Sequence, residues 1–329
     1  MTTTAAPSAD RAREPSRAWY PDVESDVRRA GVAVHYEVYG AGEPTILLLP
    51  TWSAVTSRVW KMQIPYLARH ARVITFDGRG NGRSDRPEGV EAYLVEEFAA
   101  DALAVLDACG VHRAAVVSES CGVHWALRLA VDHPERVERL VCISPAIGLA
   151  ADHPGRERYR FDERYETEEG WAKYNRHFWG RSYAEFLEWF FTQCFNEPHS
   201  TKPIEDAVGW GLETTPERLT DHTAALALYS VERQRAAADA VRCPTLVIHG
   251  TADVVRPHAQ GAALAAATGG TLLTLDGSGH LPEVRDPVRV NVALRAFACP
   301  PADTPTWRRA RNRRRRALFV SSPIGLGHA

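Results

Sequence analysis

Residues 114–127 read AAVVSESCGVHWAL, and this stretch joins a predicted strand directly to a predicted helix. The apolar run RAAVVSES (113–120) is typical of a buried strand, and CGVHWALRLAVDHP after it has helical spacing and ends at a proline. Three side chains that could attack a substrate fall at the junction: Ser118, Ser120 and Cys121. A strand that turns straight into a helix needs small neighbours around the turn, because the backbone doubles back on itself.

Only Ser120 has small residues two positions before and after it, namely Ser118 and Gly122. Cys121 would instead be flanked by a glutamate and a valine, and Ser118 lies within the predicted strand. The motif departs from its usual form at Ser118, where glycine is the common residue. The sequence therefore predicts Ser120 as the nucleophile.

Strands and helices alternate on both sides of this junction. We expect a half-buried strand at 32–40, fully buried strands at 45–50 and 137–145, and further strands ending at Asp77, at 243–250 and within 270–280, with helices at 95–110, 258–267 and 286–299. This order predicts an α/β fold with a mostly parallel central sheet and helices on both of its faces.

The alternation lapses between about residues 147 and 238, where helical patterns dense in aromatic residues replace the strands. We therefore predict one domain over residues 23–299 that carries a helical insertion. The aromatic side chains of the insertion could roof a pocket, form a small core of their own, or do both.

Four further segments carry a resemblance to the α/β-hydrolase fold family, which extends over about residues 25–300. They are LLLPTW (47–52), DGRGNGRS (77–84), PTLVIHGTADVVRP (244–257) and GSGHLPEVRDP (277–287). The resemblance implies that Asp253 is the acid and His280 the base, in the family order Ser120, Asp253, His280. The first segment departs from the family, since Pro50 and Thr51 stand where many members have His-Gly.

The chemistry of these residue types agrees with that assignment. Asp253 is the only carboxylate in a loop that directly follows a buried strand, so it could orient one nitrogen of His280. His280 could then take the proton of Ser120. The backbone N–H groups of Cys121 and Trp52 are the expected oxyanion hole, the second by alignment with the family. The resemblance also implies that the insertion is a cap that selects the substrate, and its aromatic residues favour a small molecule with an apolar portion.

Three other side chains near these motifs admit a second interpretation. His124 could be proposed as the base, but a packed helix histidine is the better interpretation. His249, inside the strand LVIHG, is interpreted as a core histidine, and Glu119 could face the pocket or a neighbouring loop. The Gly-rich stretch 78–84 lacks the Lys-Ser/Thr of a phosphate loop, so we interpret it as a turn that supports the rim of the site.

Composition excludes several classes of protein. The chain is 45% hydrophobic and 24% charged, as expected of a soluble globular protein. Its six cysteines show no metal-type spacing, and it has neither a signal sequence nor a run of the roughly 20 apolar residues that spans a bilayer. We expect a cytoplasmic protein that requires no metal or organic cofactor; its oligomeric state stays open.

Both ends of the chain differ from the predicted domain. Residues 1–22 have the composition of a disordered segment, and 300–305 that of a Pro-rich linker. Residues 308–316 hold seven of the 39 basic residues, which leaves 32 against 41 acidic ones; we expect a solvated linker and no nucleic-acid partner. ALFVSSPIGLGHA (317–329) is either a tail or the opening of a second domain, being similar to the first strand and loop of GT-B glycosyltransferases.

Together these features predict a serine hydrolase that cleaves a carboxylic ester or related acyl bond. A serine nucleophile disfavours the epoxide-hydrolase and dehalogenase chemistries of the same fold. Two alternatives stay open: a carbon–carbon or lactone hydrolase with the same three residues, and a non-catalytic hydrolase-like module attached to a larger, glycosyltransferase-like protein.

Overall fold

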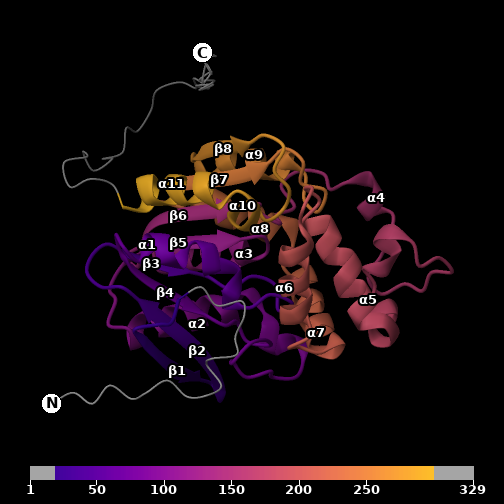
Figure 1. Ribbon diagram of the computed structural model, residues 1–329, viewed down its shortest axis with the longest axis horizontal. Helices are drawn as coiled ribbons and strands as arrows, with labels where there is room; N and C mark the ends of the chain where they lie inside the picture. Colours follow the sequence, from indigo (N-terminus) through magenta and orange to yellow (C-terminus); the bar gives the residue numbers. More distant parts are fainter. Residues whose placement is uncertain (1–18, 300–329) are drawn as a thin grey trace, which may run out of the picture.

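The computed structural model describes residues 19–299, within which eight strands form one sheet in the order β1-β2-β4-β3-β5-β6-β7-β8 (Figure 1). The first two strands run antiparallel to their neighbours, and all other neighbouring pairs are parallel. This confirms the predicted, mostly parallel sheet. The strands are β1 Val23–Arg29, β2 Val32–Tyr39, β3 Thr45–Leu48, β4 Arg72–Phe76, β5 Ala114–Glu119, β6 Val137–Ile143, β7 Thr245–Gly250 and β8 Thr271–Leu275.

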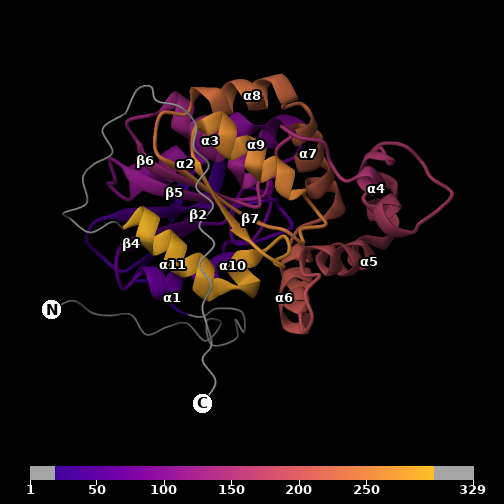
Figure 2. The same cartoon turned by 90° about the horizontal axis from the view of Figure 1, so that it is seen from above.

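Helices cover both faces of the sheet (Figure 2). One layer contains α2 (Val95–Ala108), α3 (Gly122–Asp132), α8 (Val231–Ala240) and α9 (His258–Thr268), which pack side by side. The opposite layer contains α1 (Ile64–Leu67), α10 (Pro282–Arg285) and α11 (Pro287–Ala298). Because both faces are covered, every residue of β3, β5 and β7 is buried, as the continuous apolar runs predicted.

The prediction of a half-buried strand at 32–40 was wrong, since β2 is buried along almost its whole length. Its polar side chains His35 and Glu37 are buried, and each makes a hydrogen bond. His35 Nδ1 lies 2.8 Å from Asp26 Oδ1, and Glu37 accepts a hydrogen bond of 2.6 Å from Tyr39. Residues of the short 3₁₀ helix η2 (Ser57–Met62) lie beside Glu37 and Tyr39. The alternating sequence pattern had suggested that this side of the strand would be exposed to water.

The sequence pattern did not indicate β1, whose residues VESDVRR are mostly polar. The strand forms the edge of the sheet and pairs with β2 over its full length. Three of its seven residues are half-buried and none is buried, so the hydrophobic signal that marks a central strand is missing.

The segment between β6 and β7 contains helices and no strand, as predicted. Figures 1 and 2 both show its first helices projecting to one side of the sheet and its helical layers. These elements are α4 (Pro154–Glu157), the 3₁₀ helix η4 (Gly170–Lys173), α5 (Arg176–Cys194), α6 (Thr201–Gly211) and α7 (Pro216–Ala227). A further 3₁₀ helix, η3 (Val90–Tyr93), precedes α2 and contacts α7.

No helix within residues 19–299 combines the length and the apolarity that crossing a bilayer requires. The predicted linker, arginine run and glycosyltransferase-like stretch at 300–329 lie outside the described residues, as does most of the N-terminal segment predicted to be disordered. The predicted domain boundaries stay predictions.

Candidate active site

Ser120 occupies the turn between β5 and α3 in a strained backbone conformation, with φ of 50°. The close packing around it explains the small flanking residues. Ser118 is completely buried, and its hydroxyl donates a 3.0 Å hydrogen bond to the carbonyl oxygen of Val141, so serine is accommodated where glycine is usual. A Cβ atom on Gly122 would lie only 2.7 Å from the carbonyl oxygen of Pro50.

The three residues predicted as nucleophile, base and acid form one hydrogen-bonded chain. His280 Nε2 lies 3.1 Å from Ser120 Oγ, and His280 Nδ1 lies 2.8 Å from Asp253 Oδ2. An ionised carboxylate only accepts hydrogen bonds, so Nδ1 carries the ring proton and Nε2 offers its lone pair to the hydroxyl of Ser120. This is the geometry in which an imidazole can take the proton of a serine.

Asp253 lies in the loop after β7, and four donors hold its carboxylate. Oδ1 accepts the backbone N–H groups of Val255 and Arg256 at 2.8 Å each, while Oδ2 accepts from His280 and, at 3.0 Å, from His249 Nε2. Burial alone would raise the pKa of Asp253, but the charge of His280 and the hydrogen bonds from both imidazoles hold it well below its usual range. The carboxylate therefore stays ionised.

His249 is buried, as its strand position suggested, but its partner was not anticipated. Its Nε2–H reaches both Asp253 Oδ2 and, at 3.2 Å, the carbonyl oxygen of Arg256. The side chain thus helps to fix the candidate acid. A histidine four residues before that acid, at the end of a buried strand, is the sequence signal that could have indicated this role.

The segment before Trp52 is fastened to the turn at Ser120. The Thr51 hydroxyl donates a hydrogen bond of 3.1 Å to the carbonyl oxygen of Glu119. Cys121 occupies the N-cap position of α3, directly after Ser120. Trp52 and Cys121 both line the cavity beside Ser120, where their backbone N–H groups were expected. Burial, reinforced by Glu119, raises the pKa of the Cys121 thiol far above its usual value, which disfavours the thiolate.

Glu119 faces the cavity, one of the two positions that the sequence left open. Its Oε1 lies 3.6 Å from His280 Nε2 and has no hydrogen-bond partner among residues 19–299. Burial, followed by the proximity of Glu283, raises the pKa of Glu119 well above its usual value. Burial likewise raises the pKa of Glu283 to about 8. Burial therefore favours the protonated form of both carboxyl groups.

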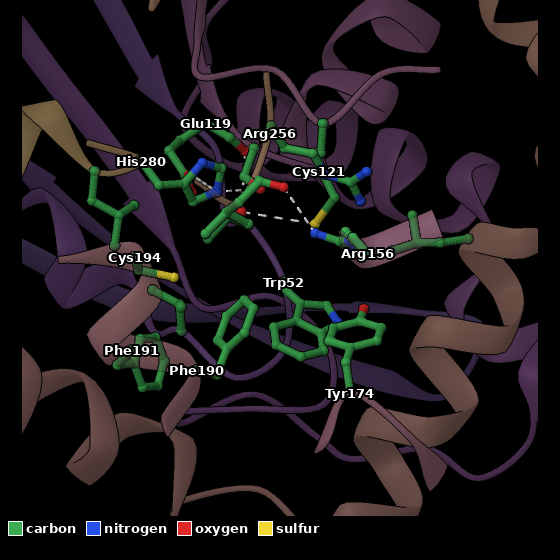
Figure 3. Close-up of a pocket in the computed structure, with 17 residues that line it drawn as sticks. Trp52, Glu119, Cys121, Arg156, Tyr174, Phe190, Phe191, Cys194, Arg256 and His280 are labelled. Carbon is green, nitrogen blue, oxygen red and sulfur yellow. Dashed lines mark hydrogen bonds and ion pairs between the residues drawn. The ribbon is translucent and has the colours of Figure 1, made fainter. Parts of the chain in front are cut away.

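A cavity opens at Ser120 (Figure 3). Its apolar wall comes largely from the helical segment, and Trp52 stacks on Tyr174 with ring centroids 5.8 Å apart. Two arginines interrupt this wall. The cavity is lined by Thr51, Trp52, Val55, Glu119, Ser120, Cys121, Ala146, Arg156, Tyr174, Phe190, Phe191, Cys194, Leu226, Val255, Arg256, His280 and Leu281.

The connection between α5 and α6 is tied to both loops that carry the candidate acid and base. Asn196 Nδ2 donates to the carbonyl oxygen of Ala252 at 2.8 Å, next to Asp253. Glu197 Oε1 accepts the N–H of Gly279 at 2.7 Å, next to His280. Nothing in the sequence around these two residues indicated such contacts.

The remaining candidates lie elsewhere. His124 is buried in α3, with its ring 5.4 Å from that of Tyr229, and is not among the cavity residues. Within residues 19–299, one group of side chains has metal-ligating atoms all within 4.8 Å of one another: Glu24, His35 and Glu37. Arg83 pairs with Glu24 at 2.9 Å, and none of the three lines the cavity at Ser120.

Comparisons with known proteins agree with this fold. The family described as alpha/beta hydrolase fold matches residues 44–283. The 2-hydroxymuconate semialdehyde hydrolase of Pseudomonas sp. (strain CF600) is 35% identical over 127 residues, or 38% of this chain and 44% of that protein. The chain thus spans less than half the length of this curated relative.

Two solved structures match most of the chain. Est816, described as an N-acyl homoserine lactone degrading enzyme, is 26% identical with a TM-score of 0.68, over 83% of this chain and 100% of its own. A hydrolase from Pseudomonas aeruginosa PA01 is 28% identical with a TM-score of 0.66, over 84% and 98%. Because the family match spans most of the sheet and the loops around Ser120, the chain belongs to the α/β-hydrolase fold family.

Proposed function

We propose that the protein is a serine hydrolase that cleaves a carboxylic ester or related acyl bond through an acyl-enzyme on Ser120. The observation that carries this proposal is the hydrogen-bonded chain from Ser120 through His280 to Asp253, at the wall of a cavity. The ionised carboxylate of Asp253 would stabilise the positive charge that His280 gains during the reaction.

In the proposed mechanism, His280 Nε2 takes the hydroxyl proton as Ser120 Oγ attacks the carbonyl carbon of the substrate. The tetrahedral oxyanion accepts hydrogen bonds from the backbone N–H groups of Cys121 and Trp52. His280 then gives the proton to the leaving oxygen, the carbon–oxygen bond breaks, and the acyl group stays on Ser120. A water molecule, deprotonated by His280, attacks the acyl carbon and releases the acid.

The apolar wall of the cavity supports a small-molecule substrate with an apolar portion. Trp52, Tyr174, Phe190 and Phe191 offer ring faces and edges to such a group. Most of these residues come from the helical segment after β6, which supports its proposed role as a cap that selects the substrate.

A carbon–carbon or lactone hydrolase is the second candidate function. Relatives whose names state a semialdehyde hydrolase and a lactone-degrading enzyme favour it. The same nucleophile and base would serve, so substrate profiling with linear esters, lactones and dienoic ketones would separate these reactions.

Labelling with a fluorophosphonate, which phosphonylates an activated serine and releases fluoride, tests the proposed nucleophile. Wild-type protein should label, and Ser120→Ala should not. Cys121→Ala should keep the label, because it retains the backbone N–H, and Ser118→Ala is the matched control for a serine two residues away. A folded wild-type protein that does not label, or a Ser120→Ala protein that does, would overturn the proposal and favour a non-catalytic module.

His280→Ala tests the proposed base. Acyl transfer should be lost while the circular dichroism spectrum and Tm show an intact fold. Retained turnover in this variant would contradict the assignment of His280.

A further inference from the structure

Two arginines line the same cavity as Ser120, although hydrolysis of an acyl bond requires neither of them. Arg156 comes from α4, in the helical segment, and Arg256 from the loop three residues after Asp253. Figure 3 shows both side chains among the residues around the cavity. A guanidinium group that faces an apolar cavity loses part of its hydration, and apolar side chains do not compensate for that loss. Its position in the cavity wall therefore indicates a further role.

Both guanidinium groups are held in position by the protein. Arg156 donates from Nη1 to the carbonyl oxygen of Val255 at 3.0 Å, and its Cζ lies 4.8 Å from the ring centroid of Trp171 and 4.9 Å from that of Tyr174. Arg256 donates from Nη1 to Asp152 Oδ2 at 2.6 Å. Such fixed groups can bind a ligand without a large loss of side-chain entropy.

The two cations share a single carboxylate. Asp152 Oδ2 lies 2.6 Å from Arg256 Nη1 and 3.5 Å from Arg156 Nε. Glu157 is exposed and accepts the N–H of Asp152. The two guanidinium groups beside the cavity therefore have one acidic partner in common, with which both form ion pairs.

The pKa values of the surrounding groups reflect the proximity of the two arginines. Burial, and then repulsion by Arg256, lower the pKa of Arg156 to about 10, so the side chain is still charged at pH 7. The positive charge of Arg256 also acts on the thiol of Cys121 and on the ring of His124. An anion bound between the arginines would relieve the repulsion between them.

We propose that Arg156 and Arg256 form a subsite for a carboxylate group carried by the substrate. This inference rests on the proposed function, since the same cavity holds Ser120. Two fixed guanidinium groups that line one cavity can each donate hydrogen bonds to an oxygen of a carboxylate. The substrate class is then an ester or lactone with an apolar body and a free carboxylate at some distance from the bond that breaks.

The experiment uses two esters that differ only in charge, mono-p-nitrophenyl adipate and its methyl ester. Wild-type protein should hydrolyse the free acid with a kcat/KM about 10-fold or more above that of the methyl ester, mainly through a lower KM. Arg156→Gln and Arg256→Gln should each reduce this ratio toward one. Arg158→Gln, an exposed arginine in the same segment, should leave the ratio unchanged.

The proposed subsite would be refuted if wild-type protein had equal kcat/KM values for the two esters. It would also be refuted if neither Arg156→Gln nor Arg256→Gln changed the ratio of these values. Arg256→Lys keeps the charge and should retain part of the preference, which a purely structural role would not require. Circular dichroism and Tm of each variant identify loss of folding.

A binding measurement separates the failure of the subsite from the failure of the proposed function. In Ser120→Ala, monomethyl adipate should quench tryptophan fluorescence at lower concentration than dimethyl adipate, and the difference should disappear in Ser120→Ala/Arg256→Gln. This result would support the subsite even if neither ester were hydrolysed. Equal affinity for the two probes would reject it even in an active hydrolase.

Discussion

A methyl group added at Gly122 would lie 2.7 Å from the carbonyl oxygen of Pro50, closer than real Cβ contacts come. That oxygen cannot move freely, because it also accepts a 3.0 Å hydrogen bond from the indole of Trp125. The separation must grow by about 0.3 Å to reach the shortest observed distance of 3.0 Å, and by about 0.7 Å to reach ordinary contact at 3.4 Å. Gly122→Ala must therefore push α3 away from the segment that precedes Trp52.

This displacement separates the two N–H groups proposed to bind the oxyanion, those of Cys121 and Trp52. A misplacement of about 1 Å can cost roughly 100-fold in rate, so a shift of this size should cost on the order of 10-fold. Overpacking of a buried contact typically costs about 1–3 kcal/mol of stability. We expect a Tm several degrees below that of the wild type, and slower labelling.

The assay is the rate constant of fluorophosphonate labelling, measured beside thermal unfolding. Gly209→Ala is the matched control, since Gly209 lies in α6 and nothing lies within 4 Å of an added Cβ there. That variant should label like the wild type and gain about 0.5–1 kcal/mol from its better helix propensity. If Gly122→Ala is labelled at the wild-type rate and unfolds at the wild-type Tm, the claim that this contact positions the oxyanion donors is refuted.

Three further predictions concern buried ionisable groups. Asp101→Ala removes the two hydrogen bonds, of 2.7 and 2.8 Å, that Arg79 donates to this carboxylate in the core, and should lower the free energy of unfolding in urea by about 3–5 kcal/mol. Asp107→Ala in the same helix removes only an exposed ion pair and should lower it by less than about 1 kcal/mol, so equal losses would contradict this prediction. Burial raises the pKa of Glu283 from 4.5 to about 8, so its contribution to stability is full below pH 4.5 and is lost as the pH rises through 8; Glu283→Gln should flatten the decline in Tm between pH 4.5 and 8, and an unchanged slope would count against the buried neutral acid. Burial lowers the pKa of His222 from 6.5 to about 3, so stability is full above pH 6.5 and falls below it; His222→Phe should make the acid-side decline shallower, which pH-dependent unfolding would show.

Sequence reasoning predicted the parts of the structure that follow from short-range sterics and from continuous apolar runs. Ser120 was identified because only its neighbours are small enough for the turn, and the buried strands because they are apolar on both faces. The edge strand β1 was missed because an edge strand needs no apolar face. The burial of β2 was misjudged because its polar residues His35 and Glu37 are buried and make hydrogen bonds within the sheet.

The missed parts of the site depend on contacts between distant segments. Arg156 belongs to a helix of four residues, too short to show a periodic pattern, and it reaches the cavity only through the tertiary fold. Asp152 likewise meets Arg256 across more than 100 residues of sequence. Spacing along the chain carries no record of such pairs, so the two-arginine subsite could be found only in three dimensions.

The hydrogen bonds from Asn196 and Glu197 to the loops of Asp253 and His280 bear on how this protein could be re-engineered. A Cβ atom on Gly279 would lie 2.3 Å from Asn196 Oδ1, so these segments fit together closely. A chimaera that imports α4 to α7 from another hydrolase would bring new walls for a substrate and would also remove both ties. We expect turnover to change even for a compound too small to touch the imported helices. Exchanging these helices would therefore alter the reactivity of the site together with its substrate range.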